Sequence, residues 1–166
     1  MNATTRLPSI IAVLLSIVLI GAGAVMLIQG LEARRDVRAA LVSEQIVTAD
    51  DAAIPGVAVD SAATARAQAD IIAEHALNLT DGRTFAQMER DDPLRPTYLQ
   101  AVTLRTSLMT AYMAYKLADL VIGLGALFLL LGIGGGAASA LTVRDAAAKT
   151  VPAASVVPQQ PVRVSA

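Results

Sequence analysis

The segment Ile10–Ile28, with the sequence IIAVLLSIVLIGAGAVMLI, decides the fold of this chain more directly than any other stretch. Its nineteen residues carry no charge, and as a helix they rise about 28 Å, close to the ~30 Å hydrocarbon core of a bilayer. A cleavable signal peptide is the competing interpretation, because a short tail with Arg6 precedes the run. The run exceeds the ~7–15 apolar residues of a signal peptide, and the LEARRDVR that follows is a poor cleavage site. We therefore predict a membrane span over residues 10–30.

A second apolar run, LADLVIGLGALFLLLGIGGGA, covers Leu117–Ala137 and has Asp119 as its only charge. It predicts a second span over residues 114–138. The chain as a whole is 55% hydrophobic and 16% charged, whereas soluble domains average about 25% charge. These features predict an all-α membrane protein in which two transmembrane helices are joined by a small helical domain, residues 31–113.

The loop domain is expected to begin as a continuation of the first span. Apolar residues recur near helical spacing through residues 29–45, where Glu32 is spaced to pair with Arg35 on the outer face. The following VTADDAAIPGV contains Pro55 and Gly56, which predict an extended or turning segment.

Three further helices are expected before the chain re-enters the membrane. One starts from a cap at Asp60 or Ser61 and ends near Gly82, and a short one over TFAQMER is capped by Thr84. Asp92-Pro93 and Arg95-Pro96 mark the start of the third, which meets no further breaker before the second span. Residues 1–9 form an N-terminal tail, and residues 139–166, rich in alanine, valine and proline without periodicity, are predicted to be disordered.

The distribution of charge bears on orientation and on partners. Residues 31–110 hold eight arginines against twelve acids, and the two tails, 1–9 and 137–166, hold four basic residues against one acid. Three arginines just after the first span argue for a cytoplasmic loop, but a loop of about 80 residues exceeds the range in which the positive-inside rule is reliable. We expect a multi-pass protein of the cell membrane with both termini in the cytoplasm. No basic surface with interleaved aromatics is present, so nucleic acid is excluded as a partner.

Small residues recur at intervals of four in both spans. Gly132, Gly136 and Ala140 form one row, and Ala12 and Ser16 form another. Small residues let helix backbones approach closely in lipid, where no hydrophobic force draws helices together. The rows predict helix contacts within the protein, with other membrane subunits or with a second copy. The alternative is that a chain rich in alanine and glycine carries such rows incidentally.

Candidate metal ligands lie on the second predicted helix. Asp70 and Glu74 share a face, and His75, the only histidine, lies about 100° round the helix. With Asp91 or Asp92 brought close by the fold, these residues could bind a divalent cation. The alternative is a solvated helix face, which we favour because metal sites rarely rest on one histidine without a dense carboxylate motif. We expect neither a metal nor a cofactor.

Other candidates are charged residues near the second span. Asp92 can cap the helix opened by Pro93, and Arg90 or Arg95 can pair with Asp91 or Glu89. The functional alternative is an anion or headgroup site made by Arg83, Arg90 and Arg95. Lys116 and Asp119 lie beside Tyr112 and Tyr115, so they are expected to anchor the helix at the membrane surface, with an ion pathway as the alternative.

Three short motifs lie between the histidine and the second span: a histidine-alanine-leucine at His75–Leu77, a glycine-(lysine or arginine)-threonine-(tyrosine or phenylalanine) at Gly82–Phe85, and an acidic RxDPLR at Arg90–Arg95. In these motifs and their order the chain resembles a family of small actinobacterial two-span membrane proteins. The resemblance covers roughly Ile10 to Gly136, and the segment Gln68–Arg95 is its specific part. It implies the same two-span fold.

Members of this family are often labelled aromatic ring-opening dioxygenases. An iron(II) enzyme of that kind needs two histidines and a carboxylate around the metal, and this chain has one histidine. No nucleophile-histidine-acid order, phosphate loop or HExxH is present. We therefore expect a non-enzymatic accessory or scaffold subunit of a larger envelope or respiratory membrane assembly. The alternative is a homo-oligomeric small channel or transporter that uses Lys116 and Asp119.

Overall fold

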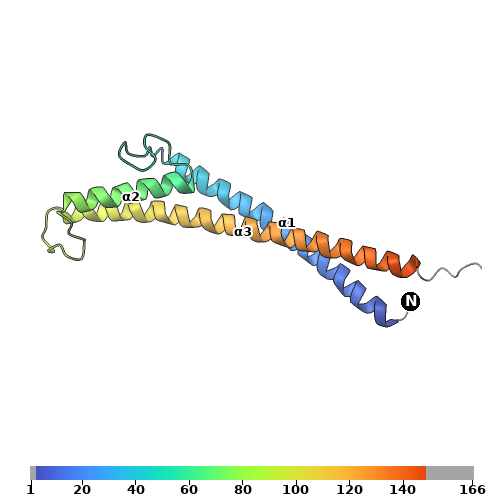
Figure 1. Ribbon diagram of the computed structural model, residues 1–166. Helices are drawn as coiled ribbons and strands as arrows, with labels where there is room; N and C mark the ends of the chain where they lie inside the picture. Colours follow the sequence, from blue (N-terminus) through green and yellow to red (C-terminus); the bar gives the residue numbers. More distant parts are fainter. Residues whose placement is uncertain (1–2, 149–166) are drawn as a thin grey trace, which may run out of the picture. The chain divides into compact units, whose positions relative to one another are not determined.

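The computed structural model describes residues 3–148 and consists there of three α-helices (Figure 1). They are α1 (Ala3–Ser43), α2 (Ala62–Leu79) and α3 (Arg95–Ala148). The described range contains no β-strand, only an isolated antiparallel bridge between Val47 and Ala58. The prediction of an all-α chain is confirmed.

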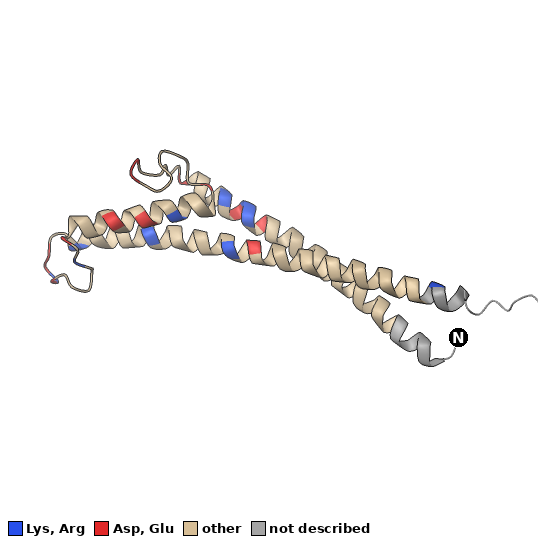
Figure 2. Ribbon diagram, viewed as in Figure 1, with Lys and Arg blue, Asp and Glu red and all other residues tan. Residues whose placement is uncertain are grey.

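Two of the three helices, α1 and α3, are long and apolar enough to cross a membrane. They have 41 and 54 residues, about twice the ~20 that a span requires. Only 11% of the most apolar stretch of α1 and 17% of that of α3 is buried. Large side chains such as Val18 (65%) and Leu130 (71%) are exposed. The apolar part of α1 carries no charged residue, and neither does α3 between Asp119 and Arg144 (Figure 2). Each helix therefore presents an apolar surface that the rest of the described chain does not cover.

The chain divides into two compact units, one of which joins the start of α1, up to Gly21, to the end of α3 from Phe128. In this unit a Cβ on Gly132 would lie 2.9 Å from the carbonyl oxygen of Ser16 and 2.7 Å from Cγ1 of Ile20. Only glycine permits so close an approach of two backbones. The hydroxyl of the buried Ser16 donates to the Ala12 carbonyl at 2.8 Å, so it needs no partner on another helix. Gly132 and Gly136 of one predicted row thus lie against Ser16 of the other, within the chain.

The other unit, Ala22–Leu127, holds the second half of α1, all of α2 and the first half of α3. Here a Cβ on Gly125 would lie 2.9 Å from the carbonyl oxygen of Gly23 and 3.0 Å from the amide nitrogen of Leu27. A Cβ on Gly30 would meet the carbonyl oxygen of Ala118 at 3.2 Å. Glycines on both helices therefore set the distance between α1 and α3.

Helix α2 begins and ends with bonded caps. Ser61 is its N-cap and forms a capping box with Thr64, in which each side chain accepts a bond from the other residue's backbone N–H. At the other end Thr80 is fully buried, and its hydroxyl donates to the carbonyl of Arg83 at 2.6 Å. Gly82 has a φ of +79°, and its N–H donates a hydrogen bond to the Leu77 carbonyl at 2.8 Å. The predicted limits of this helix are confirmed.

Alanine-rich α2 packs beside the first half of α3 (Figure 1), because small side chains let the two helices approach closely. Two apolar clusters result. The buried members of the first are Leu41, Val59, Ala65, Ala69, Leu108 and Tyr115, and those of the second are Ala76, Met88 and Tyr98. The first cluster joins all three helices, since Leu41 comes from α1 and Tyr115 from α3.

The two connections between helices differ in how well they were predicted. The first, residues 44–61, turns at Gly56 (φ +65°) as expected and is held on α2 by a bond from the Ala49 N–H to Oε1 of Gln68 at 2.9 Å. The short helix predicted over 84–90 is wrong: this stretch forms turns. Oε1 of Gln87 accepts the backbone N–H of Thr84 at 2.9 Å, and one or two turns offer too few bonds to offset helix nucleation.

The predicted tails also differ from the structure. Helix α1 already begins at Ala3, within the predicted tail 1–9. Helix α3 runs to Ala148, so the first ten residues of the predicted disordered segment 139–166 are helical. Alanine favours this continuation because of its high helix propensity. The remainder of that segment lies outside the described residues.

Candidate functional site

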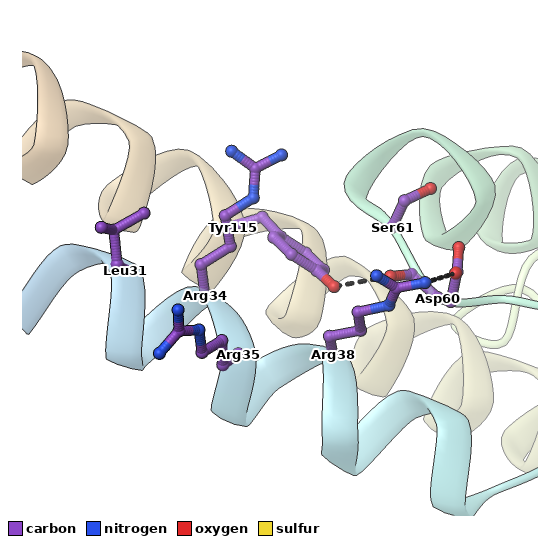
Figure 3. Close-up of a pocket in the computed structure, with 7 residues that line it drawn as sticks. All are labelled: Leu31, Arg34, Arg35, Arg38, Asp60, Ser61 and Tyr115. Carbon is purple, nitrogen blue, oxygen red and sulfur yellow. Dashed lines mark hydrogen bonds and ion pairs between the residues drawn. The ribbon is translucent and has the colours of Figure 1, made fainter.

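A cavity of about 410 Å³ opens where the apolar part of α1 gives way to charged residues (Figure 3). Helix α1 contributes Leu31 and three arginines, α3 contributes Tyr115, and the residues ahead of α2 contribute a carboxylate and a hydroxyl. The polar lining residues are Arg34, Arg35, Arg38, Asp60 and Ser61. All seven belong to the unit Ala22–Leu127. We call this cavity the arginine pocket.

Two of the arginines are held by carboxylates. Nη2 of Arg38 lies 2.6 Å from Oδ2 of Asp60, and Nη1 of Arg34 lies 3.0 Å from Oδ1 of Asp119. The hydroxyl of Tyr115 donates to the backbone carbonyl of Asp60 at 2.7 Å, as Figure 3 shows. Within the described residues, Arg35 makes no ion pair, and its predicted pairing with Glu32 does not form.

The structure places Lys116 and Asp119 on α3 near this pocket. Asp119 forms an ion pair with Arg34, and Nζ of Lys116 lies 5.6 Å from the centre of the Tyr112 ring. The Arg34–Asp119 ion pair joins α1 to α3, and the Lys116–Tyr112 contact lies along α3. In the described part of the molecule, neither contact continues into a chain of polar groups. Both Lys116 and Asp119 lie in the interior of α3, where its apolar run begins, and their role as an anchor at the membrane surface stays a prediction.

The candidate metal ligands do not come together. Nε2 of His75 lies 2.7 Å from Oδ2 of Asp51 in the first connection, and Asp70 pairs with Arg66 one turn away at 3.2 Å. Among the described residues no three histidine or acidic side chains gather as a metal site. The hydrogen bond with His75 is the main reason that the pKa of Asp51 lies below its ordinary value. Nothing in the sequence indicated that Asp51 would be the partner of His75.

The Asp-Pro-Leu-Arg stretch is a bonded corner, as predicted, but with different partners. Asp92 accepts the backbone N–H of Leu94 at 2.9 Å just ahead of α3, and it pairs with Arg83 at 2.8 Å. Arg95 donates to the Met88 carbonyl at 2.8 Å and lies 4.0 Å from the centre of the Phe85 ring. The predicted pairing of Arg90 or Arg95 with Asp91 or Glu89 is not found in the described residues. Arg83 and Arg95 therefore help to close the corner.

Asp92 should make the stability of this corner depend on pH. The Leu94 N–H first, and Arg83 second, hold the pKa of the Asp92 carboxyl below its ordinary value, which is about 3.9. A lowered folded-state pKa stabilises the fold at every pH above the unfolded value, and this contribution is lost as pH falls through the folded value. Melting curves between pH 7 and pH 3 should therefore show a smaller acid-dependent loss of stability for Asp92→Asn than for wild type, with the Asp51 contribution present in both. The matched control Asp91→Asn should retain the wild-type profile, and identical profiles for wild type and Asp92→Asn would contradict this role.

The arginine pocket was not predicted from the sequence. Its arginines were visible as a basic run after the first span, but Asp60 and Tyr115 are 22 and 55 residues away from their partners. No local pattern specifies contacts over such separations.

The described part of the chain is all-helical, and two of its helices are long and apolar enough to span a membrane. Comparison with protein-family models, with curated proteins and with solved structures found no match.

Proposed function

We propose that the chain is a non-enzymatic integral protein of the cell membrane that acts as an accessory or scaffold subunit of a larger membrane assembly. The observation that carries this proposal is the apolar surface of α1 and α3, most of which is exposed over the two candidate spans. Exposed side chains of this kind are stable in lipid or against other membrane helices. Residues 31–113 would then form a small helical domain outside the bilayer.

Some glycines on these helices make no close contact with the described part of the chain. At Gly21, Gly123 and Gly134, no described atom lies within 4 Å of the position that a Cβ would take. An open glycine on an apolar helix lets the backbone of a second helix approach closely. These positions support a role in which helices of another subunit pack on α1 and α3.

Purification in mild detergent tests the accessory role. A tagged full-length chain, expressed in its own cells, should co-purify with other membrane proteins at a fixed stoichiometry. The Gly134→Leu variant should no longer co-purify with these proteins, because the leucine side chain would block the close approach of a second helix. The variant should stay folded, because no described atom of the chain lies within 4 Å of this position. The control Leu130→Ile keeps side-chain size on the same helix and should retain them. A monomer or homodimer that carries no other protein would contradict the accessory role.

Orientation is part of the proposal: both termini are cytoplasmic and the loop domain is outside, supported by the acidic loop and basic tails. Because the chain has no cysteine, single cysteines report accessibility without background. An impermeant thiol reagent should label Asp81→Cys on intact cells and Arg144→Cys only after permeabilisation. The reverse pattern would place the loop in the cytoplasm.

A further inference from the structure

The arginine pocket has an unbalanced positive charge. Three guanidinium groups line it against the single carboxylate of Asp60. Asp119 engages Arg34 from outside the lining, which still leaves one arginine in excess. In the described part of the chain Arg35 has no ion-pair partner, whereas Arg34 and Arg38 are held in place by theirs. The pocket is thus arranged for a negatively charged group, which Arg35 could bind without breaking an existing pair.

The position of Arg35 connects the pocket to the apolar surface of α1. Ile28, Leu31, Arg35 and Arg38 are separated by three, four and three residues, so they follow one stripe of the helix. Ile28 and Leu31 are 58% and 45% exposed. Helical side chains lean toward the N-terminus of their helix, and Figure 3 shows the guanidinium of Arg35 extending in the direction of Leu31. A ligand bound to Arg35 would therefore meet an apolar surface on one side.

We propose that the arginine pocket binds the phosphate-bearing, negatively charged headgroup of a membrane phospholipid. Arg35 is its main ligand, with Arg38 and the Ser61 hydroxyl at the pocket wall, and the acyl chains lie along Leu31 and Ile28. A guanidinium fork matches two phosphate oxygens at once, and basic pockets at the membrane surface are suited to headgroups. A soluble phosphate would use the same arginines but would gain nothing from the apolar stripe. The proposal rests on the membrane location proposed above.

Lipid binding to the purified full-length chain provides the test. The protein in detergent is titrated with phosphatidylglycerol or with phosphatidylcholine of the same acyl chains, and bound lipid is counted by native mass spectrometry. We expect tighter binding of phosphatidylglycerol, and we expect Arg35→Gln to weaken it about fivefold, the effect of one arginine near a charged headgroup. The preference should diminish as salt is raised, because the contact is exposed and screened.

Two variants make the result specific to Arg35. Arg90→Gln removes one positive charge from the same unit at a residue outside the pocket, and it should keep the wild-type preference. Arg35→Lys retains the positive charge but lacks the guanidinium fork, so it should keep part of the preference for phosphatidylglycerol. Equal melting temperatures of wild type and Arg35→Gln in phosphatidylcholine would show that the fold is intact. If that variant is less stable, the Arg35→Lys titration decides instead.

Equal affinity for the two lipids, or an Arg35→Gln variant that matches wild type, would overturn the proposal. Inorganic phosphate forms the third arm: displacement of phosphatidylglycerol by phosphate at similar concentrations would identify a soluble anion and overturn the assignment to lipid. Failure of this test is distinguishable from failure of the proposed function. Thiol labelling and co-purification are measured without added lipid and would be unaffected.

Discussion

Replacing Gly125 with leucine is expected to separate α1 from α3 within the unit Ala22–Leu127. The added Cβ alone would lie 2.9 Å from the Gly23 carbonyl oxygen and 3.0 Å from the Leu27 amide nitrogen. Both are backbone atoms, which cannot rotate away as the end of a side chain can. Gly125→Ala should therefore cost about 1–3 kcal/mol, the usual range for overpacking, and Gly125→Leu should cost more.

Gly123 is the matched control on the same helix. No atom lies within 4 Å of the position that its Cβ would take, so Gly123→Leu should leave the stability of the isolated chain unchanged or slightly raised by better helix propensity. Unfolding of each variant in detergent, followed by circular dichroism, measures the difference. Equal stability of Gly125→Leu and Gly123→Leu would show that the close contact of α1 and α3 does not form.

The second large effect is expected at Tyr115. Its side chain is only 3% exposed and lies in the cluster that joins all three helices. Tyr115→Ala removes this apolar volume and should destabilise the unit by about 3–5 kcal/mol, as other truncations of buried aromatic rings do. Met113→Ala is the control, because Met113 is 61% exposed and surface truncations usually change stability by no more than about 0.5 kcal/mol.

Tyr115→Phe separates the hydroxyl from the ring. It removes only the bond to the Asp60 carbonyl at 2.7 Å, and one such bond contributes about 1 kcal/mol. The expected order of stability is therefore wild type, then phenylalanine, then alanine. A phenylalanine variant as unstable as the alanine variant would mean that the ring contributes little to the core.

Most of the course of the three helices could be predicted because the signals are local, although the outer ends of α1 and α3 were predicted as tails. The uncharged run Ile10–Ile28, the absence of a breaker after Pro96, and the Ser61–Thr64 cap each act within a few residues of the chain. The error over 84–90 is also local in origin. Helix propensity and turn bonding compete closely in so short a segment, and the side chain of Gln87 favoured the turn.

The partners of charged residues could not be predicted in the same way. Arg83 and Asp92, or Arg34 and Asp119, lie 9 and 85 residues apart, and many acids in the loop were equally plausible partners by type. Which pair forms depends on how the helices are aligned along one another. That alignment follows from the contacts of Gly30 and Gly125 and from the packing of Tyr115.

The amino-acid sequence by itself determined that this chain is helical, that two of its helices are apolar enough for a membrane, and that a charged connection lies between them. Hydrophobic run length and capping suffice for this, since both act over short distances along the chain. Only the tertiary structure decided that Arg34, Arg35 and Arg38 face Asp60 and Tyr115 around one pocket. Contacts between distant segments depend on helix packing, which a single helix does not encode.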